Sequence, residues 1–558
     1  MSGASAHKSR TQRQSRRLAA DLAKGKMPAS TVDLEDYLDR FPDDVFVALD
    51  GFVEQVASSG ADDAIALGYL YLIQGQLERV RFRSERGYED ATRLTEEFQR
   101  AVADLAVTGR IDAQALSMVT SVLHMAGIEA SAELHAGVTQ FAENVLPLAV
   151  PPDFTDATAD MVTECEGDPF QLAGALAEAG HAIPAEARIL MAVEQIHSTN
   201  AALREAAILY LLDGEPTLRR AVASELQASQ ARAASLSPES LRRLIGMRNW
   251  CPEKERPAVD AIIRAVRAKG IDCAAWPQGG AGMIHASGID GSGAQGFLIV
   301  SPVGQKVQIS SVLLKSGVRD AWSAPPASKR EVQSTLALAA TETSMRPVSR
   351  KYFDRILRHH LQVGLSAGTL PPAGLLQVAE TIGHADWQPE LLDWRSALAA
   401  MLAELPAAML TPQAVNALLH TSADWADFDE IAQSWFEDDE HVARVVADIG
   451  GRQGAQSVDR VLAEILAPRR EKWAAYFLGT ALWLREAPED SLWRGFVILA
   501  QALASGRDLA DISVMPVIAA RTVAVLSNAP APESRTEPAT AGKRRRSRPT
   551  MRTGDSLN

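Results

Sequence analysis

Apolar residues recur every three or four positions over most of the chain, which is the spacing of amphipathic α-helices. The pattern runs from about residue 31 to 276, with stripes in 92–107 and 113–126 and glycines between the units. It returns from about 329 to 527, where residues 473–484 and 496–503 form two strongly apolar segments. The sequence therefore predicts a mainly α-helical protein whose broad apolar faces pack against several neighbours.

The segment 276–322 differs from the rest of the body. Runs rich in Val, Ile and Phe at 283–289, 297–301 and 307–314 are bounded by glycine and proline. We expect three short antiparallel strands joined by tight turns, with flanking helices covering one face. The loop 290–296, DGSGAQG, reads best as a hairpin turn, because a phosphate-binding glycine loop opens a helix; a ligand-binding loop is the alternative.

Residues 198–226 contain a helical pair. One helix carries Leu203, Ile208 and Leu212, a turn with Asp213, Gly214 and Pro216 follows, and a second helix carries Leu218, Val222 and Leu226. This stretch of about 30 residues resembles a HEAT-type repeat, which implies a protein-binding surface. No regular copies recur at a fixed period, so the sequence favours an irregular α-helical array of HEAT-like helical pairs with a small inserted antiparallel β-meander.

These patterns predict six regions. They are a disordered basic N-terminal tail (1–30), a helical region (31–150), a HEAT-like helical region (151–275), a small β-module (276–328), a Trp-rich helical region (329–528) and a disordered basic C-terminal tail (529–558). Seven of the ten tryptophans fall in the Trp-rich region. No secretory signal is recognisable, and three cysteines are too few for a disulfide scaffold, so a cytoplasmic protein without a membrane span is expected.

Charge is distributed unevenly. The formal net charge is −14, yet residues 1–26 carry seven basic side chains against one acid, and 529–558 carry seven against three. The C-terminal run Lys543, Arg544, Arg545 and Arg546 is a candidate nucleic-acid contact, because clustered cations bind phosphates by counterion release. The acidic remainder would repel nucleic acid.

Two charged segments are candidate protein-docking faces. Residues 346–360 hold five basic side chains against one acid, and we take Arg350, Lys351, Arg355 and Arg358 as partner-binding candidates. Residues 421–441 hold eight acids and no Lys or Arg, and their interleaved aromatic residues predict an amphipathic helix with an acidic outer face. The acidic candidates are Asp424, Asp427, Glu437, Asp438 and Asp439. A solvated surface is the plainer interpretation of both segments.

The sequence offers little support for a catalytic site. Neither a GxSxG nor an HExxH motif occurs, adjacent His359 and His360 lack the i, i+4 spacing of a metal-binding pair, and no cofactor motif is recognised. We therefore predict a non-catalytic protein-protein interaction or scaffold protein. Nucleic-acid association through the tails is one alternative. The other is an enzyme with a site at the β-module, built from His285, Asp290, Arg319 and Asp320.

Overall fold

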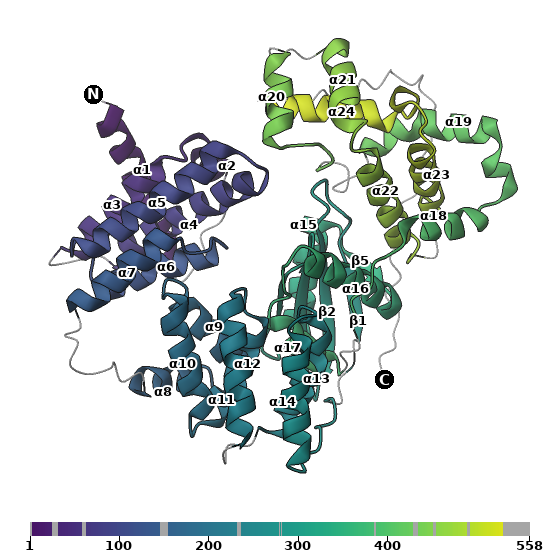
Figure 1. Cartoon of the computed structure of the whole chain (residues 1–558). Helices are drawn as coiled ribbons and strands as arrows, with labels where there is room; N and C mark the ends of the chain where they lie inside the picture. Colours follow the sequence, from purple (N-terminus) through teal and green to yellow (C-terminus); the bar gives the residue numbers. More distant parts are fainter. Residues whose placement is uncertain are drawn as a thin grey trace.

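The computed structural model describes residues 3–24, 32–58, 63–145, 155–231, 236–277, 280, 282–383, 387–427, 434–449, 454–487 and 491–527. Within these residues the protein is mainly α-helical, with a small antiparallel sheet, as the hydrophobic pattern predicts. The chain passes from an N-terminal bundle through a row of helical pairs to the sheet, and then to a C-terminal helical region (Figure 1).

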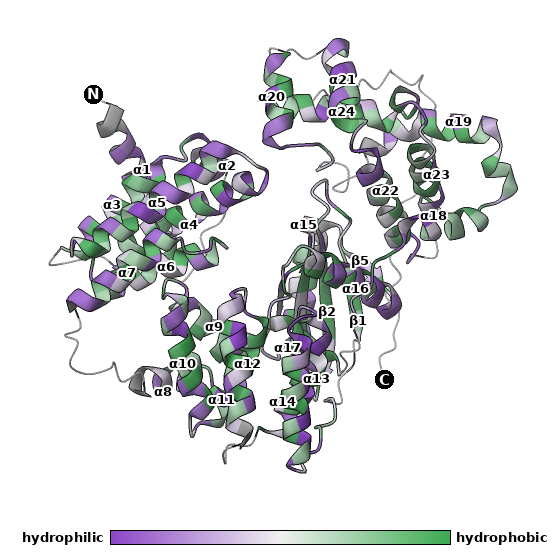
Figure 2. Cartoon of the chain, in the orientation of Figure 1, coloured by the Kyte–Doolittle hydropathy of each residue, from purple (hydrophilic) through white to green (hydrophobic). Residues whose placement is uncertain are grey.

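The N-terminal bundle has its own core. Its helices are α1 (Gly3–Leu22), α2 (Val32–Arg40), α3 (Asp44–Val56), α4 (Asp63–Glu85), α5 (Glu89–Val107), α6 (Ala113–Met125) and α7 (Ala132–Val145). Phe52, Ile73 and Phe98 are fully buried between them. Figure 2 shows hydrophilic and hydrophobic residues alternating around these helices, as expected where one face is buried.

Helix α1 corrects the expectation of a disordered tail at 1–30. Leu18 and Ala19 are buried against the bundle, and α1 packs closely on α4 at Gly68, where a Cβ atom would lie 2.4 Å from the Ser15 carbonyl oxygen. The fully buried Asp44 carboxylate of α3 accepts hydrogen bonds from Arg10 Nε (3.0 Å) and Thr11 Oγ1 (3.2 Å). Arg10 therefore attaches α1 to the bundle through the buried Asp44 carboxylate. This ion pair stabilises a helix that has few apolar residues of its own.

The described residues in the middle of the chain form α8 (Thr155–Glu164), α9 (Pro169–Gly180), α10 (Ala185–His197), α11 (Ala201–Leu209), α12 (Pro216–Ala231), α13 (Pro238–Met247) and α14 (Arg256–Ala268). The predicted helix–turn–helix is present as α11, a 3-10 turn (Tyr210–Leu212) and α12. Asn200 caps α11 through its side chain. At the junction with the N-terminal bundle, His181 Nε2 donates a hydrogen bond to Ile128 O at 2.7 Å. Burial lowers the pKa of His181 to about 4.

Within the part of the chain that the structure describes, the sheet has five strands where three were expected. In the order β4-β3-β2-β1-β5, these are β4 (Val318–Ser323), β3 (Lys306–Leu314), β2 (Gln295–Val303), β1 (Met283–Ala286) and β5 (Arg346–Val348), all antiparallel. The sequence analysis placed no strand after residue 314, whereas Val318–Ser323 form edge strand β4. Strand β5 follows α15 (Lys329–Thr343) and lies beyond the boundary set at 328.

Helices cover both faces of the sheet. Phe297 and Ile299 of β2 enter the main core, where Phe297 meets Phe353 of α16 (Arg350–Ser366) with ring centroids 5.1 Å apart. On the opposite face, Val300 and Ile309 pack against Val332 of α15.

Helix α17 (Gly374–Ile382) lies along the open edge of the sheet. A Cβ on Gly374 would stand 1.8 Å from the Ala321 carbonyl oxygen, so only glycine allows this approach. The Ser323 N–H of β4 donates to Gln377 Oε1 at 3.2 Å. The helix therefore blocks strand β4 from pairing with another chain.

The C-terminal region comprises α18 (Trp394–Ala403), α19 (Pro412–Thr421), α20 (Glu440–Asp448), α21 (Ala455–Val461), α22 (Arg470–Leu484), α23 (Trp493–Ala504) and α24 (Val514–Leu526). Helices α22 and α23 confirm the two apolar helices predicted for this region, and α23 is hydrophobic along most of its length (Figure 2). Trp483 Nε1 donates to Ala286 O of β1 at 3.0 Å, which joins α22 to the sheet.

The segment 421–441 is not the single amphipathic helix that its aromatic residues suggest. It begins with a 3-10 turn at Ser422–Asp427, residues 434–439 are irregular, and α20 starts only at Glu440. Trp435 is buried against Trp473 and Phe477, so this aromatic residue enters the C-terminal core. No helix among the described residues has the length and apolar character needed to cross a membrane.

The buried carboxylate of Asp44 gives a direct test of the N-terminal packing. Replacement Asp44→Ala leaves Arg10 without its partner and should destabilise the N-terminal bundle by about 3 kcal/mol. Limited trypsin digestion should then cleave within α1 much faster than in the parent protein. The matched control is Asp43→Ala, an exposed neighbour whose side chain caps nothing. Equal cleavage rates in the two variants would contradict the role given to Asp44.

Candidate functional site: a charged cleft between three parts of the chain

A cleft of about 650 Å³ opens where the N-terminal bundle, the sheet and the C-terminal region meet. We call it the charged cleft. Its lining residues are Glu85, Arg86, Asp290, Gly291, Ser292, Lys315, Ser316, Arg319, Ser434, Phe436, Glu437, Asp438, Asp439, Arg469 and Lys472. Five of them are basic and five acidic, so their formal charges cancel. The cleft brings together side chains that are more than 350 positions apart in the sequence.

Glu437 is the most buried of the acidic residues, at 3% exposure. Its carboxylate accepts hydrogen bonds from Lys472 Nζ (2.8 Å) and Trp473 Nε1 (2.9 Å) and pairs with Arg469. The sequence analysis placed Glu437 on an outward docking face. That assignment is wrong, because the carboxylate is buried and already bonded to Arg469, Lys472 and Trp473.

Asp438 connects the C-terminal region to the N-terminal bundle. It accepts hydrogen bonds from Arg86 Nη1 (2.7 Å) and from the Tyr88 hydroxyl (2.7 Å), both in the loop between α4 and α5. Burial, together with the neighbouring Asp438 charge, raises the pKa of Tyr88, so this hydroxyl stays protonated and donates. The Glu440 N–H also donates to Arg86 O at 3.2 Å.

Asp439 and Glu85 form further ion pairs within the chain. Asp439 caps α20 by accepting from the Val442 N–H (3.0 Å) and also pairs with Arg469. Glu85 pairs with Arg319 of β4 at 2.6 Å. Asp438 and Asp439 are therefore engaged within the chain, contrary to the docking role expected for them.

The glycine-rich loop 290–296 joins β1 and β2 as a hairpin, as predicted. Asp290 Oδ1 accepts from the Ser292 and Ala294 N–H groups and closes the turn. A Cβ on Gly291 would stand 1.9 Å from the Ser434 carbonyl oxygen, which explains the need for glycine there. Close packing against the C-terminal region accounts for this glycine.

The four residues of the enzyme alternative do not converge. Asp290 and Arg319 line the charged cleft, whereas His285 and Asp320 do not. His285 lies on β1 and Asp320 on β4, with two strands between them, a separation of about 14 Å from the ~4.8 Å spacing of neighbouring strands. Partial desolvation raises the pKa of Asp320, which lies on β4. An acid–base pair cannot act on one substrate atom across that distance.

The basic candidates of α16 divide into two pairs. Arg350 Nε bonds to Asp354 at 2.7 Å, as the i, i+4 spacing suggests, and Arg358 lies 3.9 Å from Glu390. Lys351 and Arg355, one helical turn apart, have exposed side chains and no ion pair within the described residues.

Of the remaining candidates, Asp424 is exposed on the 3-10 turn. The Asp427 side chain and the run Lys543, Arg544, Arg545 and Arg546 lie outside the described residues.

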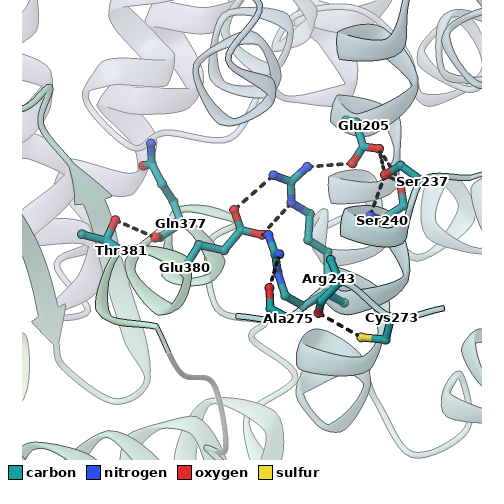
Figure 3. A network of polar contacts seen from close by, with 11 residues as sticks. Glu205, Ser237, Ser240, Arg243, Cys273, Ala275, Gln377, Glu380 and Thr381 are labelled. Atoms are coloured by element: carbon teal, nitrogen blue, oxygen red, sulfur yellow. Dashed lines mark hydrogen bonds and ion pairs between the residues drawn. The ribbon is translucent and has the colours of Figure 1, made fainter. Parts of the chain in front are cut away.

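A second polar network lies between the middle helices and α17 (Figure 3). Arg243 donates to Glu205 at 2.7 Å on one side and to Glu380 at 2.9 Å on the other, and Arg242 donates to Glu380 at 2.8 Å. Both arginines are less than 10% exposed. The sequence analysis missed this network, since Glu380 lies 137 positions from Arg243 and no local motif marks it.

Comparisons with known proteins find two domain-level similarities. Residues 184–270 match the family model of the Y4lR second domain, and residues 395–527 match the Y4lR C-terminal helical domain. A relative, the uncharacterized protein y4lR of Sinorhizobium fredii (strain NBRC 101917 / NGR234), is 26% identical over 381 residues, or 67% of this chain and 72% of the relative. No solved structure matches this chain.

These similarities bear on the HEAT-like interpretation. The helical pair 198–226 falls inside the match to the Y4lR second domain, and the HEAT-type resemblance is not confirmed. The C-terminal match contains the residues Glu437, Asp438, Asp439, Arg469 and Lys472 of the charged cleft. The similarity to y4lR carries no activity, because that protein is itself described as uncharacterized.

The contact between Asp438 and the α4–α5 loop is testable. Asp438→Asn removes the charge that faces Arg86, and the partly exposed pair should contribute about 1 kcal/mol. Amide hydrogen exchange in residues 84–90 should therefore accelerate on the order of fivefold, while α22 keeps its protection. Asp424→Asn, an exposed acid outside the cleft, is the control. Unchanged exchange in 84–90 would show that Asp438 does not hold this loop.

Proposed function

We propose that this chain is a cytoplasmic, non-catalytic scaffold that binds an acidic protein partner through α16. The contact surface is the basic ridge, defined here as Lys351 and Arg355. Long-range attraction between this ridge and acidic side chains would speed association and set the orientation of the partner. The mainly helical fold of the described residues supports this proposal.

One observation carries the proposal. Most charged residues at the junctions of this protein are paired with another part of the same chain, yet Lys351 and Arg355 point outward at i, i+4 spacing with no carboxylate partner within the described residues. Their neighbours Tyr352, Phe353, Ile356 and Leu357 are buried, so the helix is firmly seated. A rigid helix that presents two unpaired cations offers a preorganised contact for an acidic segment.

The internal pairing of the acidic residues supports the same choice. Glu437, Asp438 and Asp439 would have to break ion pairs before they could bind a partner. Asp424 keeps an exposed carboxylate and remains a candidate contact for a basic partner. The three cysteines are free thiols, two of them buried, which is compatible with a reducing compartment.

Nucleic-acid association is the second candidate function. It is favoured by the consecutive cations Lys543 to Arg546 in the C-terminal tail. Such binding would fall steeply with salt and show little sequence preference. It would also be independent of the basic ridge, which separates the two proposals experimentally.

Charge reversal of the basic ridge tests the proposal. We expect Lys351→Glu/Arg355→Glu to reduce recovery of a stoichiometric acidic partner from native lysate at least tenfold, because two attractions become repulsions. Quantitative mass spectrometry of the affinity-purified full chain measures this recovery. The control, Lys329→Glu/Arg330→Glu, reverses two exposed cations on α15 and should bind like the parent protein.

Two results would contradict the scaffold proposal. One is the absence of any stoichiometric partner. The other is equal recovery with the ridge and control variants. Recovery of nucleic acid that persists in the ridge variant and disappears when 529–558 is deleted would favour the alternative.

A further inference from the structure

A groove of about 430 Å³ lies between α12 and the start of α14, away from the charged cleft and from α16. Its lining residues are Leu211, Pro216, Arg219, Arg220, Ala223, Ser224, Gln227, Cys251, Lys254, Glu255, Ala258 and Val259. The groove falls within the residues that match the Y4lR second domain. Its volume suits a small organic molecule.

The floor of the groove is apolar. Leu211, Ala223 and Val259 are all less than 10% exposed. The Cys251 thiol also forms part of the floor, and it donates a hydrogen bond to Met247 O at 3.6 Å. Burial raises the pKa of this thiol to about 12, so it remains neutral and behaves as an apolar group. An aliphatic segment placed here would lose contact with water.

One wall of the groove is held by an internal ion pair. Arg219 donates to both carboxylate oxygens of Glu255 at 2.8 Å and also to the Asp213 carbonyl oxygen at 2.7 Å. This guanidinium is 5% exposed, and its donors are already used. The pair fixes α12 against the start of α14 and leaves the wall neutral.

The unpaired charges of the groove lie at its rim. Arg220 of α12 and Lys254, just before α14, are both exposed and belong to opposite sides of the groove. Arg220 Nε donates to Pro216 O at 3.1 Å, which orients the side chain and leaves its terminal nitrogens available. Neither cation forms an ion pair within the described residues. With the wall neutral, the groove carries two net positive charges over an apolar floor.

We infer that this groove binds a small amphipathic organic anion, with a carboxylate or phosphate headgroup between Arg220 and Lys254 and an apolar body on Ala223, Ala258 and Val259. Charge complementarity at the rim selects the anion, and the floor selects an apolar body over a fully hydrated ion. The inference goes beyond the scaffold proposal, because it uses neither the basic ridge nor the charged cleft.

Titration of the full-length protein with three probes of equal chain length tests the chemistry. Isothermal titration calorimetry with decanoate, decyl phosphate and decanol, each below its aggregation concentration, distinguishes the contribution of the headgroup to the affinity from that of the alkyl chain. Decanoate or decyl phosphate should bind at least tenfold more tightly than decanol. The stronger of the two anions tells whether a carboxylate or a phosphate source is favoured. No binding by either anion, or equal binding by decanol, would overturn the inference.

Two variants place the binding at this groove. Arg220→Ala/Lys254→Ala removes only exposed side chains. It should lower the affinity for the two anions at least tenfold and leave the affinity for decanol unchanged. Ser224→Trp, at an exposed lining position, should fill the groove and abolish binding of all three probes.

The matched control is Arg264→Ala/Arg267→Ala, two exposed arginines on α14 outside the groove, with the affinity of the parent protein as the expected result. Circular dichroism verifies that each variant is folded. Anion binding that survives both groove variants, or that is lost equally in the control, would show that the ligand binds elsewhere.

Discussion

The ion-pair network around Arg243 determines how the middle helices meet the sheet. The Arg243 guanidinium lies between the carboxylates of Glu205 and Glu380 (Figure 3). Arg242, the preceding residue on α13, also donates to Glu380. A charge this deeply buried is tolerated only when its hydrogen-bonding capacity is used. Because Glu380 belongs to α17, which covers the edge of the sheet, the network joins the helical array to the β-structure.

The same rule applies at the other junctions. Asp44 receives donors from α1, Glu437 receives donors from α22, and Asp438 is bound by Arg86 and Tyr88 of the N-terminal bundle. Arginine is well suited to this task, since its planar guanidinium can donate to two carboxylates at once. Side chains that look like solvent-facing charge in the sequence therefore connect parts of the fold. The groove between α12 and α14 and the ridge on α16 also hold exposed cations, and Arg220, Lys254, Lys351 and Arg355 form no ion pair within the described residues.

The elements that can be predicted from the sequence are those whose structure is determined by residues close together in the chain. The helices α22 and α23 and the pair α11–α12 carry apolar stripes that are long enough to identify, and β1, β2 and β3 are bounded by glycine and proline. The hairpin around Asp290 also follows from its turn residues. In each case the residues that determine the structure lie within a few positions of one another.

The elements that sequence analysis misses depend on distant partners. Strand β5 has three residues, too few for any periodicity, and exists because β1 lies beside it. Helix α1 is stabilised by Asp44, and residues 434–439 are irregular where Trp435 and Glu437 enter the C-terminal core. The Arg86–Asp438 pair spans 352 positions, so no local pattern could have placed the charged cleft.

The unfolding of a Glu380→Gln variant tests the central claim most directly. Chemical denaturation followed by tryptophan fluorescence compares it with the parent protein and with Glu390→Gln, an exposed acid that lies 3.9 Å from Arg358. If buried ion pairs hold the array to the sheet, Glu380→Gln should lose about 3 kcal/mol of stability, whereas the control should stay within roughly 0.5 kcal/mol of the parent. Equal unfolding midpoints for all three proteins would contradict the account.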